Sequence, residues 1–245
     1  MTAPEVLWPK LTTVSAPSGR GIQVWAAGLD PGNDRLATYA QTLAPDEKER
    51  AARFHAERDR RRFTVARGFL RAVLGQCIEC SPTGLVFSYE TRGKPTLVDD
   101  PAFHFNLSHS GELALLAVTR LAPVGIDVEH VRPMRDAAAI AERFFSPGES
   151  AGLNAVPEAD RPAAFFNLWT RKEAWLKATG EGISNSLNRV EVSFLPGEPA
   201  RLIRLFGESE RVGGWTLLEL TPAAGYAAAL AIEAPDAIVR CGHWV

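Results

Sequence analysis

The pattern of apolar and polar positions divides the chain into helices and strands. The clearest helical pattern covers residues 161–178 in "DRPAAFFNLWTRKEAWLKATG", and Gly180 ends it. A shorter helix begins in "LAPDEKERAARF", where Pro45 and acidic residues fill the first turn. Another begins in "FFSPGESAGL", where Ser146 and Glu149 can form a capping box. Helices are therefore expected in these three segments.

Strands are expected where β-branched and aromatic residues alternate with polar ones between turn residues. In the first half of the chain these segments are residues 21–29, 85–90, 103–107 and 113–119. In the second half, "RVEVSFLPG", "RLIRLFG", "WTLLELT" and "GYAAALAIE" predict one antiparallel sheet with turns at the glycines.

Two pairs of similar segments occur in the same order in the two halves of the chain. "RGFLRA" resembles "EAWLKA", and "GELALLAVT" resembles "GYAAALAIE". A helix followed by a glycine turn and an apolar strand is thus repeated. We therefore predict an α+β fold of two pseudo-symmetric subdomains, each a helix packed on a small antiparallel sheet. The halves are residues 1–120 and 121–245, with a ligand-binding cleft between them.

Composition limits the class of protein. With 46% hydrophobic and 23% charged residues and a formal net charge of -2, the 245-residue chain is typical of a globular protein and gives no reason to expect nucleic acid as a partner. No apolar stretch is long enough to span a membrane, and "MTAPEVLWPK" lacks the features of a signal peptide. Cys77 and Cys80 have no second pair to complete a zinc site, and with Cys241 they are typical of reduced thiols. We expect a cytoplasmic protein.

One segment departs from this even balance of charge. Between residues 58 and 71, in "RDRRRFTVARGFLR", six arginines and one aspartate give a net charge of +5. The segment is either the solvated face of a helix or a phosphate-binding surface at the edge of an apolar stripe. That stripe, at helical spacing, consists of Phe63, Ala66, Phe69 and Leu70.

The apolar run "APVGIDVEH", residues 122–130, carries two carboxylates. As a strand it places Asp127 and Glu129 on the same face, because residues i and i+2 of a strand point to one side. Like charges this close repel and favour protonation of one of them, so the pair needs a physical reason. On the long helix, Glu173 and Lys177 share a face at i and i+4, either as a surface ion pair or as part of a site.

Taken together, the motifs resemble those of the surfactin-type 4'-phosphopantetheinyl transferases. The succession "RGKP", "FNLSHS", "VGIDVE", "RFFSPGE" and "LWTRKEAWLKATGEGI" carries the resemblance, over about residues 46–184. Alone, "RGKP" with Lys94 and "FNLSHS" with Ser108 and His109 are typical of ordinary turns. The resemblance implies a pseudo-twofold α+β fold whose cleft binds coenzyme A and Mg²⁺. It also implies an apo acyl or peptidyl carrier protein as partner, and we expect a monomer.

The functional residues of the family can be carried over position by position. The resemblance implies that Asp127, Glu129 and Glu173 bind Mg²⁺, whose preference for carboxylate oxygens explains the charged pair. It implies that Glu173 and Lys177 are catalytic, Glu173 as metal ligand or general base. The implied coenzyme A contacts are Arg50, Arg58, Arg62, Lys94, Ser108, His109, Asp127 and Lys177. Which arginine holds the 3'-phosphate stays open, and Lys48 is an alternative to Arg50.

The implied reaction transfers the 4'-phosphopantetheine arm of coenzyme A to a serine of the carrier and releases adenosine 3',5'-bisphosphate. Two other classes are weighed against it. Another Mg²⁺-dependent enzyme acting on phosphate esters is disfavoured because the chain has no P-loop. A catalytically weak module that binds coenzyme A or a carrier protein is disfavoured because the carboxylate triad is intact. The sequence leaves open whether the carrier belongs to a fatty acid, polyketide or peptide synthase.

Overall fold

The structure is a computed structural model that describes residues 7–89, 93–181, 187–207 and 209–245. Its helices are α1 (Asn33–Thr42), α2 (Pro45–Ala52), α3 (Glu57–Cys77), α4 (Ala137–Phe144), α5 (Pro147–Ala155) and α6 (Arg161–Thr179). Its strands are β1 (Lys10–Leu11), β2 (Gly21–Gly28), β3 (Phe87–Tyr89), β4 (Pro95–Leu97), β5 (His104–Ser110), β6 (Leu113–Thr119), β7 (Val124–His130), β8 (Val190–Val192), β9 (Leu202–Leu205), β10 (Thr216–Leu220), β11 (Tyr226–Ile232) and β12 (Ile238–Trp244). The mixture of helices and small sheets confirms the α+β class.

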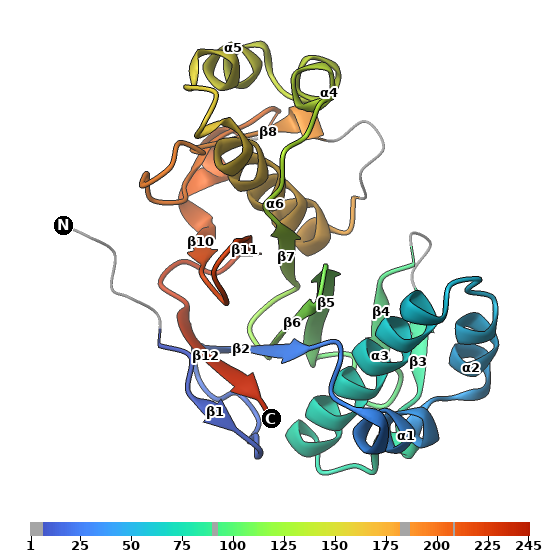
Figure 1. Cartoon of the computed structure of the whole chain (residues 1–245). Helices are drawn as coiled ribbons and strands as arrows, with labels where there is room; N and C mark the ends of the chain where they lie inside the picture. The colour runs from blue at the N-terminus through green and yellow to red at the C-terminus, as the bar shows by residue number, and fades with distance from the viewer. Residues whose placement is uncertain (1–6, 90–92, 182–186, 208) are drawn as a thin grey trace.

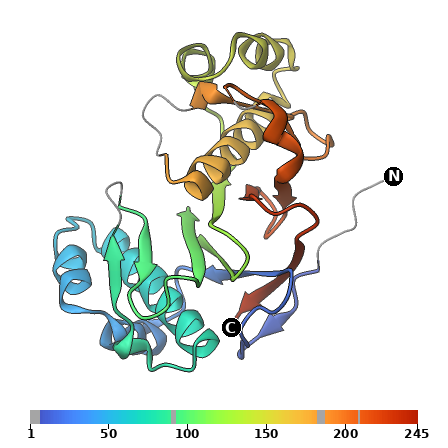
Figure 2. The same ribbon diagram turned by 180° about the vertical axis from the view of Figure 1, so that it is seen from behind.

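The strands form two main sheets and two separate pairs. The first sheet has the order β1-β12-β2-β6-β5 and the second the order β10-β11-β7, while β3-β4 and β8-β9 are the separate pairs. Figure 1 shows α1, α2 and α3 around the β3–β4 pair in one part of the molecule, with α4, α5 and α6 in the opposite part. The strands β5, β6 and β7 lie between these two groups of helices, as the view from behind also shows (Figure 2).

Buried clusters pack the sheets and helices into layers. Every residue of β6 is buried, as expected for a strand that is covered on both faces. Its Leu116 and Val118 pack in a cluster with α3, whereas Leu115 and Ala117 pack in a second cluster that also holds Leu230 of β11. The two sheets therefore share an apolar core, with α3 on the far side of the first sheet and α6 on the far side of the second.

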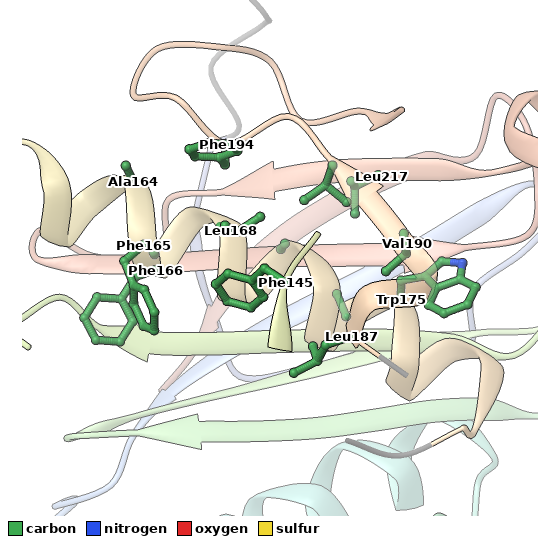
Figure 3. Packing of buried hydrophobic residues seen from close by; sticks show 14 of the residues in the cluster. Phe145, Ala164, Phe165, Phe166, Leu168, Trp175, Leu187, Val190, Phe194 and Leu217 are labelled. Atoms are coloured by element: carbon green, nitrogen blue, oxygen red, sulfur yellow. The ribbon is translucent and has the colours of Figure 1, made fainter. Parts of the chain in front are cut away.

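The third cluster lies between α6, β8 and the second sheet (Figure 3). Phe165 and Trp175 of α6 are 1% and 5% exposed, and Leu217 of β10 and Val190 of β8 belong to the same cluster. Full burial of such side chains contributes about 1.5–3 kcal/mol each. This packing holds α6 firmly, so that the side chains on its remaining face keep fixed positions.

Several expected elements are confirmed. The strand expected at residues 113–119 is β6, and the helix expected at residues 161–178 is α6, which ends at Gly180 with a φ of 73°. Ser146 and Glu149 form the expected capping box at the start of α5. The end of the strand expected at residues 85–90 lies outside the described residues, as does the arginine of "RGKP".

The single antiparallel sheet expected in the second half is wrong. β8 and β9 pair with each other, whereas β10 and β11 pair with β7. Both groups of strands pack on α6, which is buried along most of its length. The apolar strand residues of this half are therefore divided between two separate sheets that cover the same helix. The last strand, β12, lies in the first sheet, parallel to β1 and β2. No helix among the described residues has an apolar stretch that could cross a membrane.

Candidate functional site

The two neighbouring carboxylates lie on β7, on the face turned toward α6. Val124, Ile126 and Val128 of this strand point into the core between the two sheets. Because side chains alternate along a strand, Asp127 and Glu129 point to the opposite face, as the sequence predicts. The carboxylates therefore face the helix that carries the other candidate catalytic residues.

Gly125 allows α6 to approach β7 this closely. A Cβ atom at residue 125 would lie 2.0 Å from the carbonyl oxygen of Ala174 and 2.4 Å from the backbone nitrogen of Ala178. Any other residue would have to displace the helix. Gly125 thus sets the distance between Asp127 and α6, and sequence reasoning missed it, although a glycine inside an apolar strand signals a close backbone approach.

Lys177 connects the helix to the strand. Its Nζ donates to Asp127 Oδ1 at 2.6 Å, to Ser108 Oγ at 2.9 Å and to the carbonyl oxygen of Ile126 at 3.2 Å. The Ser108 hydroxyl also donates to Asp127 Oδ1 at 2.9 Å. Among the ion pairs of the described residues, Lys177 pairs with Asp127 rather than with Glu173 on its own helix. Of the two alternatives that the sequence leaves open, a simple surface pair is excluded, since Glu173 is only 4% exposed.

The other two carboxylates have raised pKa values. Burial, together with the charges of Asp127 and Glu129, raises the pKa of Glu173 to about 7 against the opposite effect of Lys177. Partial burial and the charge of Asp127 also raise the pKa of Glu129, against the hydrogen bond that Ser110 donates to it at 2.6 Å. The three carboxylates together therefore carry more negative charge than the ammonium of Lys177 can neutralise.

Side chains of β5, rather than backbone ladders, tie this strand to β7. Asn106 Oδ1 accepts from the backbone nitrogen of Ile126 at 2.8 Å, beside Asp127. Ser110 Oγ accepts from the backbone nitrogen of His130 at 3.2 Å and donates to Glu129. With Ser108 these residues form a polar row at every second position of "FNLSHS". Sequence reasoning missed Asn106 and Ser110, and this period-two polar pattern was the signal that could have found them.

The remaining candidates are His109 and four cationic residues, which have separate surroundings. His109 follows Ser108 on β5, and its pKa is lowered by partial desolvation of the imidazole and by the nearby charges of Lys177 and Arg62. Arg62 and Arg58 line one pocket of about 380 Å³, while Arg50 stacks on Phe63 in another of about 640 Å³. The structure therefore brings Ser108, Asp127, Glu129, Glu173 and Lys177 together, with His109 and Arg62 close enough to interact by charge. Arg58 shares a pocket with Arg62, and Arg50 lines a different one. Lys94 reaches backbone oxygens at the end of α6.

Known proteins resemble the chain over nearly its whole length. Residues 27–121 match the family model described as 4'-phosphopantetheinyl transferase, N-terminal, and residues 123–231 match that of the 4'-phosphopantetheinyl transferase superfamily. The 4'-phosphopantetheinyl transferase HetI of Nostoc sp. is 41% identical over 227 residues, which cover 91% of each chain.

The chain belongs to the 4'-phosphopantetheinyl transferase superfamily.

Two more distant sequence relatives agree with this assignment. The transferase Sfp of Bacillus subtilis is 32% identical over 65% of this chain and 69% of its own length. The human L-aminoadipate-semialdehyde dehydrogenase-phosphopantetheinyl transferase is 26% identical over 94% of this chain and 81% of its own. A solved structure described as apo-ACPS from Chronobacterium ammoiniagenes superposes with a TM-score of 0.33 at 24% identity, over 44% of this chain and 92% of that chain. The expected family and enzyme class are confirmed: the protein is a 4'-phosphopantetheinyl transferase, with coenzyme A as substrate and carrier proteins as partners.

The carboxylates of this transferase suit a hard divalent cation. Asp127 Oδ2 and Glu173 Oε1 are buried and have no hydrogen-bond partner among the described residues. Unpartnered buried carboxylate oxygens are costly, and they are the donors that Mg²⁺ prefers. As the described side chains stand, no group of three His, Cys, Asp or Glu residues is arranged to hold a metal. The ammonium of Lys177 and the hydroxyl of Ser110 instead occupy one oxygen each of Asp127 and Glu129.

Proposed function

We propose that this transferase moves the 4'-phosphopantetheine arm of coenzyme A to a serine of an apo acyl or peptidyl carrier protein in a Mg²⁺-dependent reaction. The products are the holo carrier and adenosine 3',5'-bisphosphate. The observation that carries the proposal is the cluster of Asp127, Glu173 and Lys177, in which two buried carboxylate oxygens lack partners beside one ammonium. An excess of negative charge at a cleft is suited to binding a metal together with the phosphates of a substrate.

The carboxylates Asp127, Glu129 and Glu173 would hold the ion. When bound, Mg²⁺ supplies positive charge to the pyrophosphate of coenzyme A. Asp127 has one oxygen on Lys177 and one without a partner, so the side chain can serve the lysine and the ion together. These residues bind and orient the phosphates rather than react with them.

Lys177 and Glu173 are assigned to the transfer itself. The serine oxygen of the carrier forms a bond to the phosphorus that bears the pantetheine arm, and the bond from that phosphorus to the departing adenosine 3',5'-bisphosphate breaks. The ammonium of Lys177 neutralises the charge that grows on the departing phosphate. The serine loses its proton, and Glu173 is the carboxylate that we assign to accept it, directly or through a water.

The remaining polar residues are assigned to the anionic substrate. Ser108 and His109 border Lys177, and Arg62 is the arginine whose charge reaches His109, so Arg62 is our first choice for the 3'-phosphate. Arg58 lines the same pocket as Arg62 and is the second choice. The last two proposed contacts are Arg50, which lines a pocket with Phe63, and Lys94, whose ammonium reaches backbone oxygens at the end of α6.

The surroundings of the enzyme belong to the same proposal. We assign a monomer in the cytoplasm that has no nucleic acid partner, in keeping with the free cysteines and the small net charge. We divide it into halves at residues 1–120 and 121–245, since the two matching family models meet at this point. The native carrier, of a fatty acid, polyketide or peptide synthase, is left to experiment.

Mass spectrometry of apo carrier proteins tests the proposal. Each carrier is incubated with coenzyme A and the transferase, with Mg²⁺ or with EDTA. We expect at least one carrier to gain the mass of phosphopantetheine at a serine with Mg²⁺ and to stay unchanged with EDTA. Transfer that is equally fast in EDTA would contradict the metal assignment, and no transfer to any carrier class would contradict the proposed reaction.

A further inference from the structure

Lys94 connects the two halves of the molecule. It stands immediately before β4, in the part of the molecule that holds α1, α2 and α3 (Figures 1 and 2). Its Nζ donates to the carbonyl oxygen of Lys177 at 2.6 Å, to that of Val124 at 3.3 Å and to that of Ala178 at 3.4 Å. One ammonium from the first half thus binds both the end of α6 and the start of β7.

The end of α6 has carbonyl groups that need such a donor. The last carbonyls of a helix have no partner within the helix. The backbone nitrogens of Gly180 and Glu181 and the hydroxyl of Thr179 all donate to the same oxygen, that of Leu176. The next two carbonyls, of residues 177 and 178, receive the Lys94 ammonium, and a cation is favourable at this negative end of the helix dipole.

The basic residue of the last helical turn is used elsewhere. Lys177 is the basic side chain in that turn of α6, and a lysine there often interacts with the last carbonyls. Here its ammonium is directed instead to Asp127, with Nζ and Oδ1 2.6 Å apart. Lys94 therefore provides the cation at the helix end in place of Lys177. Its ammonium binds the backbone carbonyl oxygen of Lys177 itself.

We propose that Lys94 is a positioning residue of the transferase, which holds the last turn of α6 against the start of β7 and so keeps Lys177 on Asp127. The inference rests on the proposed function, because it concerns the same catalytic lysine. It differs from the contact to coenzyme A that the family resemblance implies for Lys94. A contact to substrate alone affects the KM for coenzyme A, whereas a positioning role affects kcat at saturating coenzyme A and the ligand-free protein.

Three variants separate these roles. Lys94→Met keeps the aliphatic stem and removes the ammonium, while Lys94→Arg keeps a cation with several donors. Lys10→Met is the matched control, because Lys10 is an exposed lysine on β1, outside the site. Two measurements are made on each protein: steady-state transfer to an apo carrier with coenzyme A varied, and amide hydrogen exchange of the ligand-free protein at the end of α6.

We expect Lys94→Met to lower kcat at saturating coenzyme A about tenfold and to speed amide exchange in the last turn of α6 by a similar factor. Lys94→Arg should recover most of both, and Lys10→Met should equal the parent. The proposal is overturned if Lys94→Met keeps the parent kcat and the parent exchange rates, with only the KM for coenzyme A raised. It is also overturned if the arginine variant recovers neither quantity.

The failure of this inference is distinguishable from failure of the proposed function. If the parent transfers nothing to any carrier, the proposed function fails, and the exchange measurement still decides whether Lys94 holds the end of α6. If the parent transfers normally, but the amide hydrogens in the last turn of α6 exchange at the parent rate in Lys94→Met, the proposed function stands and the positioning role of Lys94 is wrong.

Discussion

Two lysines five residues apart on α6 each meet a carboxylate at 2.6 Å, and yet they have different surroundings. Lys172 pairs with Glu149 and is fully buried, and its ammonium also donates to the carbonyl oxygens of Leu187 and Val190. Lys177 pairs with Asp127, and its side chain is 27% exposed. The distance within the ion pair therefore does not tell a structural pair from a functional one.

The difference lies in whether the carboxylate is satisfied. Both oxygens of Glu149 have partners: the backbone nitrogen of Val192 donates to Oε1, and that of Ser146 donates to Oε2 beside Lys172. Asp127 Oδ2 has no partner among the described residues. A saturated buried pair leaves no donor or acceptor for a ligand, whereas an unsaturated pair retains binding capacity at a cost to stability. Glu149 and Lys172 therefore hold the fold, whereas Asp127 and Lys177 are the pair that we propose to serve the reaction.

The largest effect is expected on stability. Lys172→Met removes the cation and leaves the Glu149 carboxylate buried with only backbone donors, which should lower the free energy of unfolding by about 3–5 kcal/mol. Chemical denaturation measures this. The double variant Lys172→Met with Glu149→Gln is the control and should recover part of the loss, since no buried charge remains. A Lys172→Met protein as stable as the parent would contradict the structural role.

The next effect depends on pH. Burial raises the pKa of Glu173 to about 7, above the value of 4.5 in the unfolded chain, so the folded protein binds the proton more tightly. The free energy of unfolding should therefore fall as pH rises from about 4.5 through 7, by on the order of 3 kcal/mol in total. Glu173→Gln should lack this loss.

Unfolding in EDTA, followed from pH 4.5 to 8, measures the difference between the parent and Glu173→Gln. The two proteins should be closest in stability at the acid end, and the glutamine variant should be the more stable at pH 8. Glu158→Gln, at an exposed position ahead of α6, is the matched control. A constant difference between parent and Glu173→Gln across this range would show that Glu173 keeps an ordinary pKa in the fold.

Lys177→Met should show the opposite profile from Lys172→Met. Loss of the ammonium removes a contact that strengthens as the phosphate departs, so kcat should fall at least ~10²-fold, equivalent to about 2.7 kcal/mol. Its melting temperature should stay close to that of the parent, because the side chain is partly solvated. Transfer at the parent rate by this variant would return Lys177 to a structural role.

The smallest effect concerns the anion contact. Arg62→Met should weaken binding of coenzyme A about ten- to a hundredfold, since a hydrogen bond to a charged group contributes roughly 1.5–3 kcal/mol. Binding of dephospho-coenzyme A should change little, because the lost contact is to the 3'-phosphate. Calorimetric titration of both ligands measures the ratio. An equal loss of affinity for both ligands would show that another arginine binds the 3'-phosphate, and Arg58 would be tested next.

Local patterns made much of the fold predictable. The period of two placed Asp127 and Glu129 on one face of β7, and the capping box at Ser146 marked the start of α5. These features depend on residues a few positions apart, so the sequence contains them directly. The same holds for Gly180, whose positive φ ends α6.

Long-range partners could not be predicted in this way. The parallel pairing of β12 with β2 joins segments over 200 residues apart, and a period of two says nothing about which strand is the neighbour. Arg171 and Lys172 look like solvated residues in the sequence, but both are buried because acceptors from several other segments surround them. The contacts of Lys94 and Asn106 likewise depend on how the halves meet.

The central proposal is that the unsatisfied carboxylates of Asp127 and Glu173 bind Mg²⁺. Calorimetric titration of Mg²⁺ into the transferase with coenzyme A present tests it, on the parent, on Asp127→Asn and on the exposed control Asp34→Asn. We predict one site of equal affinity in the parent and in Asp34→Asn, and at least ~10-fold weaker binding in Asp127→Asn. Unchanged Mg²⁺ affinity in the Asp127→Asn protein would contradict the account.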